Sequence, residues 1–94
     1  MTVKINIPPN FQYFTDNAET VEVNGRSVIE CLQILVERFP GLATILFDES
    51  DVFRDDPLNF VAIFLNGIHV RPEELSSQVN DGDELELVYV ILGG

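Results

Sequence analysis

One stretch of the chain has a clear helical pattern, and it limits the folds that the rest can adopt. Ser27 and Glu30 form the capping-box signature of a helix N-terminus. Pro40-Gly41 stops a helix, so the pattern predicts one over residues 27–39. Its apolar residues have the spacing of a single buried stripe: Val28, Cys31, Leu32, Leu35, Val36 and Phe39. A lone helix of this kind must bury its stripe against one other layer.

The remaining patterns are typical of short strands. We expect strands at residues 3–7, 20–23, 60–65, 68–70 and 84–91. Asn66-Gly67 is a tight-turn signal between the third and the fourth of them. The order of strand, strand, helix and three strands predicts an α+β domain, in which the helix covers one face of the sheet and leaves the other open.

The connecting segments contain apolar residues of their own. The aromatic residues of segment 10–19 are expected to fold back onto an edge of the core: Phe11, Tyr13 and Phe14. Residues 42–47 are expected to form one further helical turn under the sheet. Residues 48–59 are an acidic loop, with a short edge strand expected at 52–53.

Alternation along two strands assigns their side chains to the two sheet faces. Glu84 and Glu86 cannot lie in the core, so we expect the odd positions of strand 84–91 to face the helix. In strand 60–65, we assign these residues to the core: Val61, Ile63 and Leu65. The open face then carries an apolar patch beside the chain end: Phe60, Phe64, Val88 and Val90. Contiguous patches of this kind mark interfaces. The alternative is that the acidic loop covers the two phenylalanines.

Length and composition narrow the class of protein. A chain of 94 residues is one domain, residues 1–94. Its longest apolar runs, 60–65 and 87–92, are far shorter than the ~20 residues that a membrane span needs. The N-terminus lacks the pattern of a signal peptide, and a single cysteine fits a reducing compartment. We therefore expect a cytoplasmic protein with no membrane partner.

The chain is strongly acidic, with 16 acidic and 5 basic residues and a net charge of −11. Nucleic-acid binders need a basic surface, so we expect no nucleic-acid partner. Solubility is the simpler explanation of the charge. Steering toward a partner with a basic docking face is the alternative.

The last strand runs directly into a tail at residues 92–94, Leu92-Gly93-Gly94. A C-terminal carboxylate is ionised at neutral pH and is a poor electrophile. Attack on the α-phosphate of ATP would activate it as an acyl-adenylate. Glycine suits a narrow nucleotide pocket, because it has no Cβ and φ of either sign is open to it. We therefore expect Gly94 to be the reacting group.

A series of short motifs carries a family resemblance. In chain order they are Ile7-Pro8, Val23-Asn24-Gly25, Phe39-Pro40-Gly41-Leu42, Phe60-Val61, Leu65-Asn66-Gly67, Val70-Arg71, Asp81-Gly82-Asp83 and Gly93-Gly94. Over most of its length the chain resembles the ubiquitin-like sulfur carriers of the MoaD/ThiS family. The family fold is the β-grasp, so the resemblance implies a mixed sheet of four to five strands with one main helix across one face.

The resemblance also implies a role for the tail. In the family, an E1-like enzyme adenylates the terminal glycine, here Gly94, using ATP and magnesium. Sulfur from a persulfide donor then replaces AMP and leaves a thiocarboxylate. A second partner, a sulfur-accepting synthase, uses that sulfur to make molybdopterin, cysteine, thiazole or thiolated tRNA. Gly93 would thread the tail into the enzyme. The sheet face around Phe64 and Val88, together with Leu92, would dock the partners, and the chain would be a protein co-substrate rather than an enzyme.

Other functions stay open at this point. The chain could be a modifier conjugated to lysines, or an interaction module whose diglycine is incidental. Residues 89–92 stand where many molybdopterin-type members have a proline pair, which weakens that assignment. The long segment 41–59 nevertheless looks more like the molybdopterin and cysteine branches than like the thiazole branch.

The remaining reactive residues have simpler explanations. Cys31 lies on the buried helix stripe, which favours core packing over a persulfide relay. His69 has no Cys or His nearby in the sequence, and the acidic loop lacks the calcium-loop pattern, so we expect no metal site. No phosphate-binding loop is present, so we expect no bound cofactor and assign ATP binding to the partner.

Overall fold

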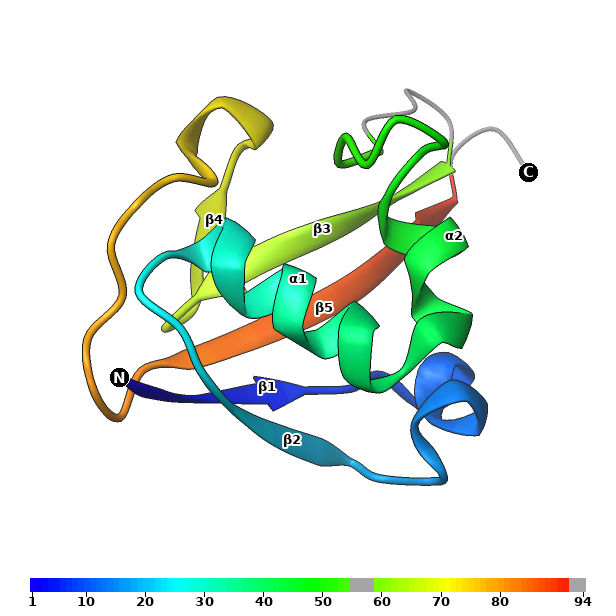
Figure 1. Ribbon diagram of the computed structural model, residues 1–94, viewed down its shortest axis with the longest axis horizontal. Coiled ribbons are helices and arrows are strands. Elements are labelled where there is room, and N and C mark those ends of the chain that lie inside the picture. The colour runs from blue at the N-terminus through cyan, green and yellow to red at the C-terminus, as the bar shows by residue number, and fades with distance from the viewer. Residues whose placement is uncertain (55–58, 92–94) are drawn as a thin grey trace.

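The computed structural model describes residues 1–54 and 59–91, and arranges them as a sheet crossed by one main helix (Figure 1). The strands are β1 (Thr2–Asn6), β2 (Thr20–Asn24), β3 (Asn59–Leu65), β4 (Ile68–Val70) and β5 (Glu84–Ile91). The helices are α1 (Val28–Arg38) and α2 (Ala43–Leu46), with 3₁₀ turns η1 (Pro9–Thr15), η2 (Pro40–Leu42) and η3 (Pro72–Glu74). The strand order is β2-β1-β5-β3-β4. β1 runs parallel to β5 and the other neighbouring pairs are antiparallel, so the sheet is mixed, as a β-grasp requires.

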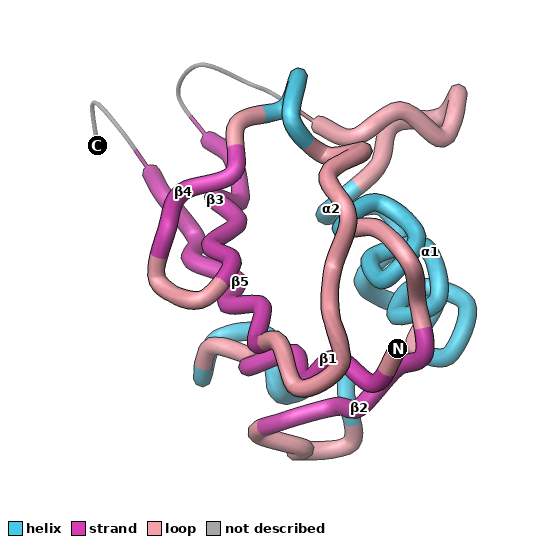
Figure 2. Tube along the Cα trace, turned by 90° about the vertical axis from the view of Figure 1, so that its left-hand side faces the viewer, coloured by secondary structure: helices cyan, strands magenta, loops and turns pink. Residues whose placement is uncertain are grey.

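Helix α1 begins and ends where the sequence predicts. The Ser27 hydroxyl accepts a hydrogen bond from the Glu30 N–H at 3.2 Å, which caps the first turn. The predicted stripe faces the sheet: Val28, Cys31, Leu32 and Leu35 are fully buried, and Val36 and Phe39 are partly buried against the same core. Figure 2 shows α1 and α2 on one side of strands β3, β4 and β5. This arrangement leaves the other side of those strands as the open face.

The predicted alternation of β3 and β5 is confirmed for the described side chains. Val61, Ile63, Leu85 and Leu87 are buried in the core, and Leu65 and Tyr89 pack against it while staying partly exposed. The opposite positions of both strands therefore lie on the open face. Ala62, between Val61 and Ile63 on β3, lies on the open face and is nevertheless buried. Its side chain is a single methyl group near the centre of the sheet, paired with Val88 on β5, so larger neighbours cover it.

The segment between β1 and β2 contains the 3₁₀ helix η1, which we did not predict. Phe11 is buried, and its ring centroid lies 5.4 Å from that of Tyr89. Tyr13 is 84% exposed, so the prediction that it folds back onto the core is wrong. A 3₁₀ helix has three residues per turn, which puts Phe11 and Phe14 on one side and leaves Tyr13 on another. Phe14 lies across Gly41, where an added Cβ would meet its ring at 2.7 Å.

The further helical turn predicted at residues 42–47 is confirmed as η2 and α2, with Leu42 and Leu46 fully buried. The expected edge strand at 52–53 is reduced to one isolated bridge between Phe47 and Phe53. Their rings meet edge to face, with centroids 6.1 Å apart. This contact ties the start of the acidic loop to the core.

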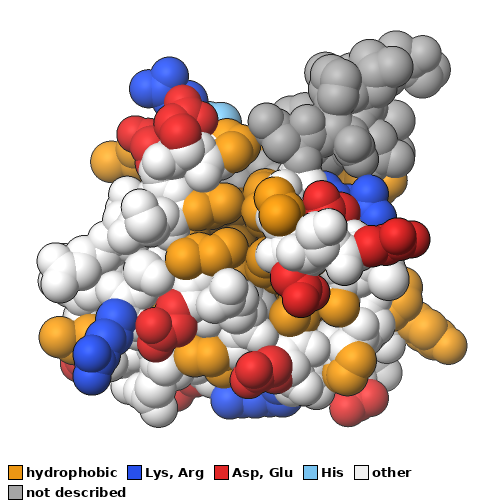
Figure 3. All heavy atoms as spheres, turned by 45° about the horizontal axis from the view of Figure 1, so that its top comes forward, with side chains coloured by type: hydrophobic (Ala, Val, Ile, Leu, Met, Phe, Trp, Pro, Cys, Tyr) orange, Lys and Arg blue, Asp and Glu red, His pale blue; other side chains and the backbone are white. Residues whose placement is uncertain are grey.

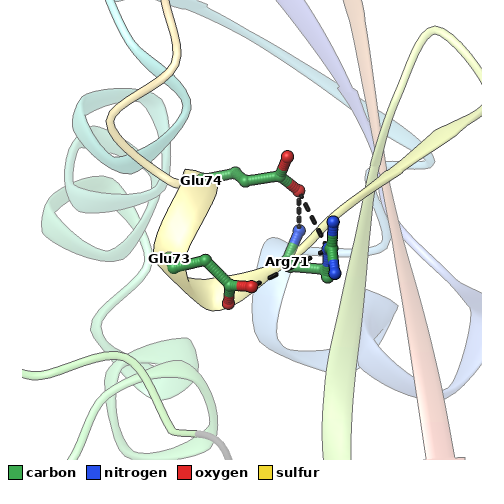
Figure 4. Close-up of polar contacts among 3 residues, drawn as sticks. All are labelled: Arg71, Glu73 and Glu74. Carbon is green, nitrogen blue, oxygen red and sulfur yellow. Dashed lines mark hydrogen bonds and ion pairs between the residues drawn. The ribbon is translucent and has the colours of Figure 1, made fainter.

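The connection from β4 to β5 starts with a polar cap at η3. The Arg71 N–H donates to the Glu74 carboxylate at 3.0 Å, and the Arg71 guanidinium lies 3.5 Å from Glu74 and 3.7 Å from Glu73 (Figure 4). The backbone hydrogen bond from Arg71, helped by its charge, lowers the pKa of the Glu74 carboxyl. The residues are exposed, so the cap orients the turn more than it stabilises the fold.

Candidate functional site

The candidate site is the open face of β3 and β5, beside the place where β5 leads into the tail. Phe64, Val88 and Val90 lie on this face and are half-buried. Phe60 belongs to β3, and its backbone is paired with Val90. The side chain of Phe60 and all of residues 92–94, which include Leu92, Gly93 and Gly94, lie outside the described part of the chain.

The strand register places β3 and β5 side by side along the patch. The backbone of Phe60 pairs with that of Val90, while Ala62 pairs with Val88 and Phe64 with Glu86. For Ala62, Phe64 and Val88, whose side chains the structure describes, this pairing puts neighbours on the two strands in contact range on the same face. The apolar patch therefore runs along both strands toward Ile91, the last residue of β5.

Polar and charged groups border this patch. The rings of Phe64 and His69 lie 5.4 Å apart, and His69 is exposed. At the far end, Lys4 of β1 lies 3.9 Å from Glu84, and Glu86 is exposed one pleat further along β5. An apolar centre with a polar rim is the usual anatomy of a protein interface.

Asn66 connects the β3–β4 turn to the start of β5, a role that the sequence analysis missed. Its backbone N–H donates to the Glu84 carbonyl at 2.9 Å, and its side-chain oxygen accepts from the Glu84 N–H at 2.9 Å. Its side-chain amide donates to Asp83 at 3.0 Å. The Asn80 N–H and this amide lower the pKa of the Asp83 carboxyl. The Asn66-Gly67 motif signals the turn but not this second attachment.

A hollow of about 440 Å³ lies next to the patch, lined by residues 6–10 of the chain and residues 86–89 of β5. It lies where β1 has ended and β5 continues. Among the described residues that line this hollow, the charged one is Glu86.

A second hollow opens on the helix side of the molecule. Figure 3 shows hydrophobic side chains gathered between two charged margins on that side. The residues that line it come from α1, the acidic loop and η3: Ile29, Val52, Phe53, Leu75, Asp51 and Glu73. No local sequence pattern indicates this hollow, because its walls come from three segments that are far apart in the chain.

The other candidate residues take no part in the open face. Cys31 is fully buried, as predicted, and burial followed by the charge of Glu30 raises the pKa of its thiol to about 11. Asp48 caps its own loop by accepting from the N–H groups of Ser50 and Val52 at 2.8 and 3.1 Å. Across residues 1–54 and 59–91, no three His, Cys, Asp or Glu side chains are grouped to hold a metal ion. None of the described helices is long and apolar enough to cross a bilayer.

Comparison with solved structures places the fold among known small proteins. A chain of the Amycolatopsis orientalis BexX/CysO complex is 26% identical with a TM-score of 0.80, over 98% of this chain and 99% of that one. SAMP1 from Haloferax volcanii is 22% identical with a TM-score of 0.82, over the full length of both chains. Subunits 1 and 2 of the Helicobacter pylori molybdopterin-converting factor form a complex in which one chain is 21% identical, with a TM-score of 0.59 and full coverage of both chains.

Two comparisons of the sequence give different outcomes. No curated protein sequence gives a significant match. The sequence model of the ThiS family, however, matches residues 8–94, which include α1, strands β2 to β5 and the two terminal glycines. The chain therefore belongs to the ThiS family of ubiquitin-like sulfur carriers.

Proposed function

We propose that the chain carries sulfur on its own terminal carboxylate. An E1-like enzyme would bind ATP and magnesium, and a carboxylate oxygen of Gly94 would attack the α-phosphate and expel pyrophosphate. A sulfur nucleophile from a persulfide donor would then attack the acyl carbon and expel AMP. Reduction of the remaining sulfur–sulfur bond by a thiol leaves a thiocarboxylate, which a second partner consumes.

The observation that carries this proposal is the family match, which runs through Gly93 and Gly94. The fold supports it, because β5 is hydrogen-bonded to β3 along its length and ends at Ile91, directly before the tail. Because β5 is held by these hydrogen bonds, the position at which the tail begins is fixed. On this proposal the chain is a co-substrate, and the adenylating chemistry belongs to the enzyme.

The patch on the open face is the proposed docking surface. Phe64, Val88 and Val90 are half-buried there, and Phe60 and Leu92 belong to the same proposal. Gly93 would lie in the narrow approach to the nucleotide. Two of the similar structures are complexes with a second protein, which is the behaviour expected of a carrier.

The acceptor of the sulfur is proposed from the names of the similar proteins. The similar proteins include CysO and a molybdopterin-converting factor, so we favour the cysteine and molybdopterin branches. The fold is shared by both branches and does not discriminate between them. Incubation of the thiocarboxylate form with each candidate acceptor system would decide, because only the true acceptor returns the chain to its carboxylate form.

The test is mass spectrometry of the chain after incubation with the host's E1-like enzyme, ATP, magnesium and a sulfur donor. We expect the mass to rise by the difference between sulfur and oxygen. The same chain extended by one alanine after Gly94 is the control and should stay unchanged. A wild-type chain that neither exchanges pyrophosphate nor gains mass would refute the proposal.

A second candidate is conjugation to lysine side chains. It is suggested by the similarity to SAMP1, which a related solved structure describes as a small archaeal modifier protein. Lysine would attack the same acyl-adenylate, so both functions share the first step. Higher-mass adducts joined through Gly94 in the native host would identify this function.

A further inference from the structure

Strand β5 is longer than its pairing with β1. The parallel pairing stops at Asn6 and Glu86, whereas β5 continues to Ile91 and stays paired with β3 throughout. Figure 1 shows β1 and β5 diverging beyond this point. The edge of β5 that faces β1 is therefore unpaired with β1 from the Leu87 carbonyl onward.

Two hydrogen bonds fix which backbone groups point to that edge. The Asn66 N–H bonds to the Glu84 carbonyl, so even-numbered residues of β5 point their backbone groups at β3. The Lys4 N–H bonds to the Asp83 carbonyl, so odd-numbered residues of this segment point theirs at β1. The Asn6–Glu86 pairing uses the Leu87 N–H, so the groups that face the leftover edge are the Leu87 carbonyl and the backbone N–H and C=O groups of Tyr89 and Ile91.

Pro8 explains why the ladder stops. The Ile7 N–H turns away from β5 and bonds to the Glu19 carbonyl at 2.8 Å, so residue 8 is the next position that faces β5. Proline has no N–H to donate to the Leu87 carbonyl. The Pro8 carbonyl accepts from the Phe11 N–H at 2.9 Å, which starts η1, and it accepts no hydrogen bond from the Tyr89 N–H.

The edge is accessible. The hollow of about 440 Å³ lies between residues 6–10 and residues 86–89, where β1 would run if it continued alongside β5. A water molecule takes ~30 Å³ in the liquid, so the space holds on the order of ten waters and can admit a backbone. Within residues 1–54 and 59–91, no hydrogen bond from outside the sheet reaches the backbone of Leu87 or Tyr89.

We propose that this edge, from Leu87 to Ile91, accepts an extended strand of the E1-like enzyme, which continues the sheet in place of β1. This inference rests on the proposed function. The strand would donate to the Leu87 carbonyl and accept from the Tyr89 N–H, which is recognition by strand addition. A basic side chain of the strand would face Glu86, the charge in the hollow.

The position of the edge, next to the tail, favours the E1-like enzyme as the partner. Residues 92–94 follow Ile91 directly, so an enzyme strand paired with residues 87–91 would direct the tail toward the enzyme. This pairing would also reduce the conformational entropy that the tail loses when it binds. A second copy of the chain is the competing occupant. Pairing two β5 edges would bring the Glu86 residues of two molecules with a net charge of −11 each toward each other, which opposes association.

Hydrogen exchange of the wild-type chain tests the inference without any substitution. In the free chain, the Tyr89 amide should exchange faster than the Val88 and Val90 amides, which face β3. In the complex with the host's E1-like enzyme, exchange at Tyr89 should slow by at least about tenfold. Unchanged exchange at Tyr89 in a saturated complex would overturn the inference. Slowing in the chain alone at high concentration, with dimers in sedimentation, would identify a second copy as the occupant and overturn it equally.

A pair of variants gives an independent test. Tyr89→Pro removes the edge N–H, and Tyr89→Ala removes the same ring but keeps the N–H. Residue 89 does not bond to β3, so both variants should keep the sheet, which circular dichroism and the melting temperature check. We expect Tyr89→Pro to bind the enzyme at least about tenfold more weakly than Tyr89→Ala.

The outcomes separate the inference from the proposed function. Equal binding of the two folded variants, with normal thiocarboxylate formation on the wild-type chain, would overturn strand addition and leave sulfur carriage standing. If Tyr89→Pro does not fold, the exchange measurement on the wild-type chain decides. A wild-type chain that is never adenylated would overturn both.

Discussion

Gly25 and Cys31 are in such close contact that only glycine fits before helix α1. A Cβ at residue 25 would lie 2.6 Å from the Cys31 sulfur and 3.2 Å from its backbone nitrogen. Cys31 is fully buried, so its side chain has little room to move away. The Asn24-Gly25 motif therefore reflects packing against the helix as well as a turn.

We predict that Gly25→Ala destabilises the fold by about 1–3 kcal/mol, the usual cost of overpacking a core. Urea unfolding measures this. In the Cys31→Ala background the same substitution should cost less, because the sulfur is gone and the backbone contact alone remains. An unfolding midpoint unaffected by Gly25→Ala would contradict the close approach.

The buried thiol of Cys31 should make stability depend on alkaline pH. Its pKa is raised from 9.0 to about 11 in the folded chain, first by burial and then by the Glu30 carboxylate. Above pH 9 the unfolded chain loses this proton while the folded chain keeps it, so the unfolded state is favoured. The stabilising contribution is complete below pH 9 and is lost as the pH rises toward 11.

Unfolding free energies of the wild type and of Cys31→Ala, compared from about pH 8 to pH 11, test this. The two proteins differ only at residue 31, so the difference in slope belongs to the thiol. A wild type whose stability falls no faster than that of Cys31→Ala would refute the prediction. Iodoacetamide should also modify Cys31 only after unfolding.

At the level of elements, Asn66 both forms the turn between β3 and β4 and attaches that turn to the start of β5. Its φ of 51° is in the left-handed region, where asparagine is tolerated, and its side chain is bonded to both Glu84 and Asp83. The turn thus fixes β3 to the beginning of β5, at the end of the sheet opposite to the tail. The candidate docking face depends on this attachment because it lies on the same two strands.

We predict that Asn66→Gly destabilises the fold by about 1–2 kcal/mol, since glycine keeps the turn conformation but loses two side-chain hydrogen bonds. Asn66→Ala should cost more, because it adds the strain of a Cβ at positive φ. Thermal unfolding of the three proteins gives the order. A glycine variant as stable as the wild type would mean that the side-chain bonds contribute nothing.

At the level of the whole molecule, the net charge of −11 works against compactness. The described ion pairs are exposed, and 5 basic residues cannot balance the charge of 16 acidic ones, so repulsion between like charges dominates. Salt screens this repulsion within a Debye length that shortens from roughly 30 Å at 0.01 M to roughly 10 Å at 0.1 M.

We therefore predict that the melting temperature rises by a few degrees, equivalent to about 1 kcal/mol, when sodium chloride is raised from about 10 to 500 mM. Potassium chloride should act alike, which distinguishes screening from binding of a particular cation. A melting temperature that falls with either salt would show that attractive pairs outweigh the repulsion.

The pattern of the sequence alone determined the elements and their faces. Capping and a 3.6-residue period define α1, and charged residues at alternate positions of β5 allow one orientation only, because a buried glutamate without a partner is too costly. The β-grasp and the family followed from the order of short motifs. These features are local, so each can be recognised in the residues that form it.

The tertiary structure decided whatever depends on segments meeting across the chain. Tyr13 and Phe11 look equivalent in the sequence, and only the three-residue turn of η1 separates the exposed ring from the buried one. Pro8 reads as the end of a strand. Its consequence, an open edge on β5 at Leu87 and Tyr89, exists only because β1 and β5 lie side by side despite being nearly eighty residues apart. Long-range pairing leaves no local signal, because the partner of a backbone group is chosen by the fold and not by its neighbours in the chain.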